Sequence, residues 1–145
     1  MDWVYQGNVV EQVPEGVIGF VYRITNLTTG REYIGKKNFY AAKTNYKTVT
    51  VKTGANAGTK KKKKIRSKIE SDWATYHGSS DALSKDVTLL GEDAFSRVIL
   101  KMCTSKAELS YYEAKYQFTE DVLLHPEKYY NSWISVRVRG QHLDS

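Results

Sequence analysis

Two tyrosines and a glutamate are the residues whose types and spacing suit chemistry in this sequence of 145 residues. Tyr22 and Tyr33 each lie in a short run of apolar and aromatic residues, and a polar segment ending at Gly30 joins the two runs. This pattern predicts a β-hairpin, which brings the two phenols within cross-strand reach of each other. Packing alone also explains tyrosines in strands. The hairpin by itself therefore predicts that the two tyrosines are neighbours, and does not indicate that they are catalytic.

The glutamate, Glu113, lies in the longest predicted helix. Ser105-Lys106-Ala107-Glu108 is a capping box, and it predicts a helix from there to about Leu124. One stripe of this helix consists of Leu109, Tyr112, Tyr116 and Leu123, and Glu113 falls inside it. A carboxylate on a packed face is costly unless it is paired, hydrogen-bonded or bound to a cation. An ion pair with a nearby Lys or Arg and a bound cation therefore both stay open.

The remaining elements must position these side chains. Residues 65–76 place three apolar residues at i, i+4 and i+8, which predicts a short amphipathic helix. Ser79 or Ser80 caps a second helix that Gly91 closes, and residues 94–102 predict a strand that pairs with the opening hairpin. The polar residues 1–15 are expected to form a leader before the first strand, anchored by Trp3 and Tyr5. We therefore expect an α+β fold, with a small antiparallel three-stranded sheet flanked by helices.

Positive charge is concentrated in one segment. The sequence carries 22 Lys and Arg against 16 Asp and Glu, a net charge of +6 with a pI near 9.3, which favours an anionic partner. Residues 45–52 alternate and predict a strand or hairpin arm, and residues 54–58 predict a hinge. Next comes the lysine run Lys60, Lys61, Lys62, Lys63 and Lys64, followed by Arg66 and Lys68. Because lysine is almost never buried unpaired, the run is a solvated loop, a localisation signal or a cationic strap along a phosphate backbone. We favour the strap.

Length and composition predict a single domain over residues 1–145, large enough to fold without disulfides. Cys103 is the only cysteine, so an internal disulfide is excluded and a reducing compartment is favoured. No apolar run approaches the roughly 20 residues of a membrane span, and the N-terminus lacks a signal pattern. The histidines His77, His125 and His142 are scattered, which argues against a zinc site. We expect a cytoplasmic protein with no membrane partner.

Val21-Tyr22 together with Tyr33-Ile34-Gly35 resembles the paired motif of the GIY-YIG nuclease family. The predicted order of hairpin, helix, strand and helix is also the order in that family. Glu113 matches the metal-binding glutamate on the family's long helix, and Tyr130-Asn131 matches a later asparagine that follows a tyrosine. The resemblance covers residues 18–135, with residues 39–64 as a lysine-rich insertion after the second strand.

This resemblance implies metal-dependent hydrolysis of DNA phosphodiester bonds. Glu113 would bind one divalent cation, Mg²⁺ or Mn²⁺, against a phosphate oxygen. Tyr22 would be the general base that takes a proton from water, Tyr33 would position it, and Asn131 would brace the site. Because a phenol with a pKa of about 10 is a poor base at neutral pH, nearby cations, among them Lys36, are expected to lower the pKa of Tyr22.

The family usually carries an arginine shortly after the second motif, and residues 36–43 contain none. Either the insertion delays the helix and Arg66 takes this role, or Lys43 replaces the arginine. We favour Arg66, because it opens the predicted helix and because a lysine lacks the planar fork of donors. Glu70 occupies the place where some members have a histidine, which leaves His77 as a loose candidate.

The resemblance is to small freestanding endonucleases of the homing type that are encoded by bacteriophages, which would act in the cytoplasm of an infected host cell. The residues expected to bind DNA are Lys60, Lys61, Lys62, Lys63, Lys64, Lys68, Arg137 and Arg139. A protein partner or oligomerisation that adds specificity stays open. So do two other classes of protein: a catalytically silent nucleic-acid-binding module of the same fold, favoured by the missing arginine, and a basic RNA-associated structural protein.

Overall fold

The structure, a computed structural model, describes residues 1–140. These residues form two compact units. The core unit contains residues 1–39 and the described residues from Asp72 onward, and the β-arm contains residues 40–71. In the described part of the chain, no helix is both long and apolar enough to cross a membrane.

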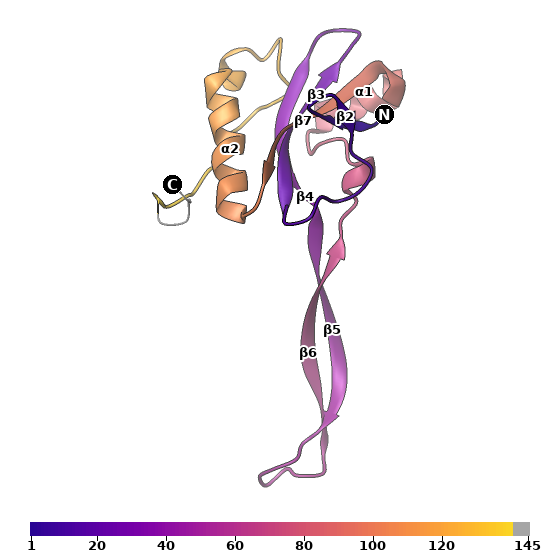
Figure 1. Cartoon of the computed structure of the whole chain (residues 1–145), viewed down its shortest axis with the longest axis vertical. Coiled ribbons are helices and arrows are strands. Elements are labelled where there is room, and N and C mark those ends of the chain that lie inside the picture. Colours follow the sequence, from indigo (N-terminus) through magenta and orange to yellow (C-terminus); the bar gives the residue numbers. More distant parts are fainter. Residues whose placement is uncertain (141–145) are drawn as a thin grey trace. The chain divides into compact units, whose positions relative to one another are not determined.

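A mixed five-stranded sheet runs through the core unit (Figure 1). Its order is β2-β1-β7-β3-β4, with the strands β1 (Trp3–Tyr5), β2 (Asn8–Val9), β3 (Gly19–Asn26), β4 (Glu32–Asn38) and β7 (Phe95–Cys103). Strand β3 lies antiparallel to both β4 and β7, so these three strands form the antiparallel sheet that the sequence predicts.

The prediction of only three strands was wrong, because residues 1–15 are part of the sheet. Strand β1 pairs parallel to β7 and antiparallel to β2. Trp3 is only 1% exposed, its ring lies 4.9 Å from that of Phe20, and its indole Nε1 donates to the carbonyl of Trp73. Burial of this one large aromatic residue holds the short N-terminal strand on the sheet.

The β3-β4 hairpin is confirmed. Its loop closes through hydrogen bonds from the Gly30 N–H to the Asn26 carbonyl (2.7 Å) and from the Thr28 N–H to the Asn26 side chain (2.9 Å). Gly30 has φ +79°, a conformation that glycine adopts without strain. Tyr22 pairs with Gly35 and Ile24 pairs with Tyr33, so both tyrosines lie on the same face of the sheet.

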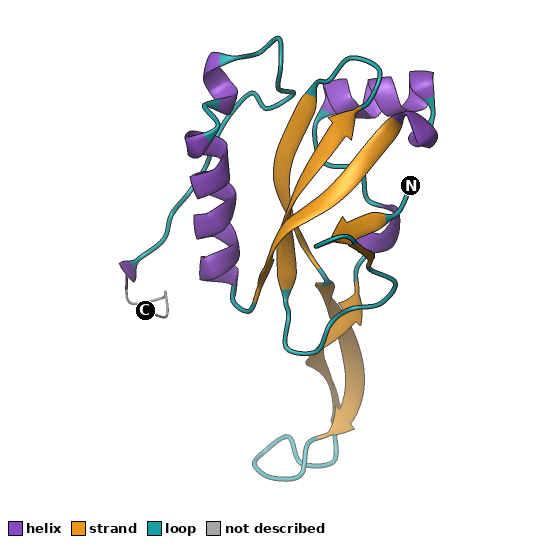
Figure 2. Cartoon of the chain, turned by 45° about the horizontal axis from the view of Figure 1, so that its top comes forward, coloured by secondary structure: helices purple, strands orange, loops and turns teal. Residues whose placement is uncertain are grey.

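The two long helices cover opposite faces of the sheet (Figure 2). Helix α1 (Asp81–Leu90) packs through Leu83 on the face of Phe20, Tyr22 and Ile24, together with the 3-10 turn η1 (Trp73–Thr75). Helix α2 (Lys106–Thr119) packs through Leu109 on the opposite face. The alternation of β3 creates these two apolar layers, because successive side chains point to opposite faces.

The predicted helix caps are confirmed, but one helix end was wrong. The Ser80 side chain accepts from the Leu83 N–H, Gly91 closes α1, and the Ser105 side chain accepts from the Glu108 N–H. Helix α2 ends at Thr119 and not near residue 124, because Asp121 adopts a left-handed conformation (φ 51°). A 3-10 turn, η3 (Val122–Leu124), follows, and another, η2 (Glu92–Ala94), precedes β7.

The β-arm is a two-stranded antiparallel ribbon of β5 (Tyr40–Thr50) and β6 (Lys60–Glu70). The predicted hairpin arm is therefore present, and the lysine run forms part of β6. The helix predicted over residues 65–76 was wrong, since β6 extends to Glu70 and only the short turn η1 is helical. Ile65 and Ile69 are four residues apart, and a spacing of four also places two side chains on one face of a strand.

Candidate active site

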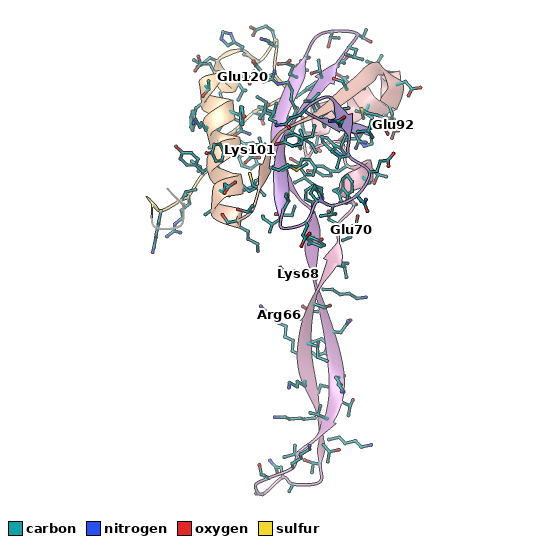
Figure 3. All side chains as sticks on the ribbon, in the orientation of Figure 1. Arg66, Lys68, Glu70, Glu92, Lys101 and Glu120 are labelled. Atoms are coloured by element: carbon teal, nitrogen blue, oxygen red, sulfur yellow. The ribbon has the colours of Figure 1, made fainter. Side chains whose placement is uncertain are left out.

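A pocket of about 950 Å³ in the core unit brings together most of the predicted catalytic residues. Tyr22, Tyr33, Lys36, Glu113 and Asn131 all line it. Arg66, the sixth, does not line this pocket; it is an exposed residue of β6 (Figure 3). Lys43, the other candidate for the role of the family's arginine, is an exposed residue of β5.

The pocket lies along β4, which is one of the two edge strands of the sheet. Glu32 at the start of β4 is bonded through its main chain to Lys128 and Tyr130 (2.8 and 2.7 Å). Ile34 lies two residues after Glu32 on β4. The Asn131 side chain accepts from the Ile34 N–H (3.1 Å) and donates to the Ile34 carbonyl (2.8 Å). An edge strand exposes unpaired backbone groups, and the segment 128–131 satisfies them on this strand.

Glu113 lies near the same strand edge, next to Lys36. Its Oε1 is 4.0 Å from the Lys36 Nζ, which also donates to the Ser110 hydroxyl (2.9 Å). Burial raises the pKa of the Glu113 carboxyl, and the charge and the backbone of Lys36 partly oppose this shift. The ion pair that the sequence left open is thus present, but it does not fully offset the cost of burying the carboxylate.

Tyr22 is 1% exposed and lies within a cluster of aromatic rings. Its ring centroid is 5.2 Å from that of Trp3, 6.1 Å from that of Tyr33 and 6.0 Å from that of Tyr76. Burial, followed by the neighbouring Tyr76 and Tyr33, raises the pKa of Tyr22 well above its ordinary value. The groups that shift the pKa of Tyr22 in the protein alone are therefore tyrosines and Glu113, and the lowering expected from Lys36 is not present. The lowering expected from a bound metal ion stays a prediction.

Two glycines make room for the tyrosine pair. A Cβ atom on Gly35 would lie 2.5 Å from the Tyr22 hydroxyl and 2.8 Å from the Tyr33 Cε1. Gly78, with φ +92°, approaches the same hydroxyl, since a Cβ there would lie 3.3 Å from it. The glycine of the Tyr33-Ile34-Gly35 motif is thus required by the ring that crosses over it.

Tyr33 is the more accessible of the two tyrosines, being only partly buried. Its hydroxyl lies 2.9 Å from the hydroxyl of Ser79, which precedes α1. Burial raises the pKa of Tyr33, while the hydrogen bond with Ser79 lowers it. Tyr33 is therefore held in place from the side of α1, whereas Glu113 and Lys36 are held from the side of α2.

His77 lies outside the pocket lining. Its Nε2 is 3.1 Å from the Glu92 carboxylate, and burial lowers the pKa of the imidazole. Of the residues predicted to bind DNA, Lys60 to Lys64, Lys68, Arg137 and Arg139 are all exposed. His142 falls outside the described residues.

Arg31 and Gln117 line the pocket and were missed from the sequence. The Arg31 guanidinium lies 4.3 Å from the centroid of the Tyr130 ring and donates to the Pro126 carbonyl (3.1 Å). Gln117 donates to the Ile34 carbonyl (2.9 Å). Helical spacing was a usable signal for Gln117, which follows Glu113 by four residues; Arg31 lies two residues before Tyr33, close to the motif.

The donors in the pocket fit a magnesium ion better than a transition metal. Within residues 1–140, no three His, Cys, Asp or Glu side chains gather as a metal cluster. Mg²⁺ is usually held by one or two carboxylates, with water and substrate phosphates as the other ligands. Glu113 provides one such carboxylate in the pocket, and Asp81 also lines it.

The chain matches the model of a protein family described as putative endonuclease segE, GIY-YIG domain, over residues 3–134. Comparisons with curated proteins and with solved structures gave no match. The family match spans most of the chain, and it includes the hairpin motif, the long helix and the edge segment that build the pocket. The resemblance seen in the sequence is thereby confirmed, and the chain belongs to the GIY-YIG nuclease family, in the group of the putative endonuclease segE.

Proposed function

We propose that the protein is a divalent-metal-dependent DNA endonuclease of the freestanding homing type. Membership of the family points to a nuclease that acts on DNA. The observation that carries the proposal is the pocket at the edge of β4, where the tyrosines of the hairpin motif meet Glu113 and Lys36. A buried tyrosine, a partly buried tyrosine and a partly buried carboxylate around one cavity are more than packing requires.

The residues of the pocket would divide the work of hydrolysis. The Lys36 ammonium binds and orients the scissile phosphate, and the Glu113 carboxylate would hold the divalent cation beside it. Tyr33, partly buried, positions the attacking water, and Tyr22 accepts the proton from it. The water oxygen bonds to phosphorus as the bond from phosphorus to the leaving sugar oxygen breaks, and that oxygen takes a proton from solvent. Asn131 keeps β4 in register with the segment that borders the pocket. When bound at Glu113, Mg²⁺ or Mn²⁺ supplies the positive charge that neutralises a phosphate oxygen and favours the ionised forms of Glu113 and Tyr22.

A guanidinium for the phosphate is available from Arg31. It lines the pocket, and its contacts with Tyr130 and Pro126 fix its position. Arg66, the residue favoured from the sequence, remains the alternative for this role, although the helix that supported its assignment is absent. The two arginines differ in what their loss would do: loss of a pocket guanidinium lowers the rate of cleavage, whereas loss of an exposed cation on the β-arm lowers DNA affinity.

Conversion of supercoiled plasmid to open and linear forms, with Mg²⁺ and with EDTA, tests the proposal. Wild type should cleave only with the metal, and Glu113→Gln should abolish cleavage while DNA binding persists. Arg31→Ala should lower the rate by about 10²-fold or more at every salt concentration. Arg66→Ala should lower it mainly at high salt, through weaker binding. The opposite result for the two arginines would return the phosphate-binding role to Arg66.

A catalytically silent nucleic-acid-binding module is the second candidate. The raised pKa of Tyr22 favours it, because a neutral buried phenol is a poor base. In that case wild type would bind DNA but leave the plasmid intact with Mg²⁺ and with Mn²⁺.

A further inference from the structure

The β-arm carries all of the protein's excess positive charge. Residues 40–71 hold ten Lys and Arg against one acidic residue, a net charge of +9. The rest of the sequence holds twelve Lys and Arg against fifteen Asp and Glu, a net charge of −3. The core unit alone is therefore acidic, and attraction to a polyanion must come from the β-arm.

The pairing of β5 with β6 divides the cations between two faces of the ribbon. Residues directly opposite one another share a face, and the faces alternate along each strand. The even-numbered face presents Lys60, Lys62, Lys64, Arg66 and Lys68 with one carboxylate, Glu70, for a net charge of +4. The odd-numbered face presents Lys43, Lys47, Lys61 and Lys63 with no carboxylate, also +4. The five consecutive lysines are thus not one patch.

The ribbon has no packed face of its own. Every residue of β5 and β6 is exposed except Val49, and Figure 3 shows the side chains of Arg66 and Lys68 projecting from the ribbon. Lys47 and Lys63 are directly opposite each other, a pairing of like charges that destabilises a sheet. An isolated two-stranded hairpin is marginal in water, so a partner that neutralises both faces would stabilise this one.

We propose that the β-arm inserts into the major groove of duplex DNA, with backbone phosphates facing both sides of the ribbon. This rests on the proposed function in taking DNA as the partner. A strap along a single phosphate backbone needs cations on one face only, whereas a groove places phosphates on two sides. The major groove, about 12 Å wide, admits a two-stranded ribbon as it stands, whereas the minor groove, about 6 Å wide, admits one only if the duplex is widened or bent at a cost in free energy. Ten steps of about 3.3 Å make the ribbon about one DNA turn long.

Matched variants of the full-length chain test this placement through binding alone. One variant changes Lys60, Lys62 and Lys64 to Gln, and the other changes Lys47, Lys61 and Lys63 to Gln. Their controls carry Arg at the same positions. Groove insertion predicts that the two Gln variants lose affinity to a similar extent. In each of them the slope of log affinity against log salt concentration should become less steep by about 2.7, the value for three phosphate contacts. Loss confined to the even-numbered face would overturn the proposal in favour of the strap.

Chemical footprinting of wild type bound to DNA in EDTA identifies the groove without any variant. Dimethyl sulfate methylates guanine N7 in the major groove and adenine N3 in the minor groove. The proposal predicts protection of guanine N7 over about one helical turn, and protection of adenine N3 alone would overturn it. Duplex RNA should compete poorly, because its major groove is too narrow; equal competition would also overturn the proposal. Because these readouts need no cleavage, an intact plasmid would disprove the nuclease and leave the groove assignment standing.

Discussion

At the level of single residues, the motif tyrosines depend on surroundings that come from distant parts of the sequence. The hairpin pattern predicted that Tyr22 and Tyr33 are neighbours, which the structure confirms. The raised pKa of Tyr22 could not be predicted, because it arises from burial beneath Trp3 and Tyr76, 19 and 54 residues away along the chain. Local patterns thus identify which residues meet, but not how deeply they are buried.

Gly35→Ala should damage the site by displacing Tyr22. The added methyl would lie 2.5 Å from the phenol oxygen, and overpacking of this kind costs about 1–3 kcal/mol. The temperature of thermal unfolding and the rate of plasmid cleavage should both fall. Gly140→Ala is the control, because nothing lies within 4 Å of a Cβ at that position. Wild-type stability with full cleavage in Gly35→Ala would contradict the close approach.

Glu113→Gln should stabilise the protein at neutral pH in EDTA. Since the pKa of Glu113 is raised in the folded state, the folded protein keeps this proton to a higher pH than the unfolded chain does. The free energy of unfolding therefore falls as the pH rises from the ordinary glutamate pKa through the raised one. The neutral amide avoids that loss. The difference in free energy of unfolding between variant and wild type should therefore be larger at pH 7 than below the ordinary glutamate pKa of about 4.3. Denaturant titrations at pH 3.5 and 7 measure it, and a constant difference would contradict the pKa shift.

Addition of Mg²⁺ should reverse the order of stability of these two proteins. A ligand that binds the folded state at 100 times its Kd adds about 2.7 kcal/mol, and Glu113 is the proposed carboxylate ligand. Thermal unfolding should shift upward for wild type and little for Glu113→Gln, whereas Glu127→Gln, at an exposed site, should respond like wild type. Equal shifts in all three proteins would place the metal elsewhere.

At the level of elements, local signals predicted what local interactions determine. The hairpin, the Ser80 and Ser105 caps and the strand at Phe95–Cys103 all carry their signals within a few residues. Strand β1 does not, because it depends on pairing with β7, more than 90 residues later. The apolar spacing of residues 65–70 suits a helix and a strand equally, and pairing with β5 decides in favour of the strand.

Asn131→Ala should loosen the edge of β4 that borders the pocket. The change leaves the Ile34 N–H without its acceptor and removes one donor to the Ile34 carbonyl. An unsatisfied buried donor costs about 1–3 kcal/mol. Amide hydrogen exchange at Ile34 should accelerate, and the exposed neighbour Ser132→Ala serves as the control. Unchanged exchange at Ile34 would show that the side chain is not what holds this edge.

At the level of the whole molecule, charge and core are separated between the two units. The two apolar clusters of the core unit contain no residue of the β-arm, and the β-arm holds the cations. We therefore expect the core unit to fold without the ribbon. Tyr40 pairs with Glu70 and Ala41 with Ile69, so the chain ends left by removing residues 42–68 can be joined by Asn-Gly, the favoured two-residue hairpin turn.

This shortened chain should unfold cooperatively and keep its stabilisation by Mg²⁺, because the pocket residues Glu113, Lys36, Tyr22 and Tyr33 all remain. Its affinity for duplex DNA should fall at least about tenfold at 150 mM salt, since the phosphate contacts that drive counterion release are lost. Calorimetry with and without Mg²⁺ and a salt series of binding measurements check both expectations. An unfolded product would show that the core needs the β-arm. Undiminished DNA affinity would place the binding surface on the acidic core unit, against the charge distribution of the sequence.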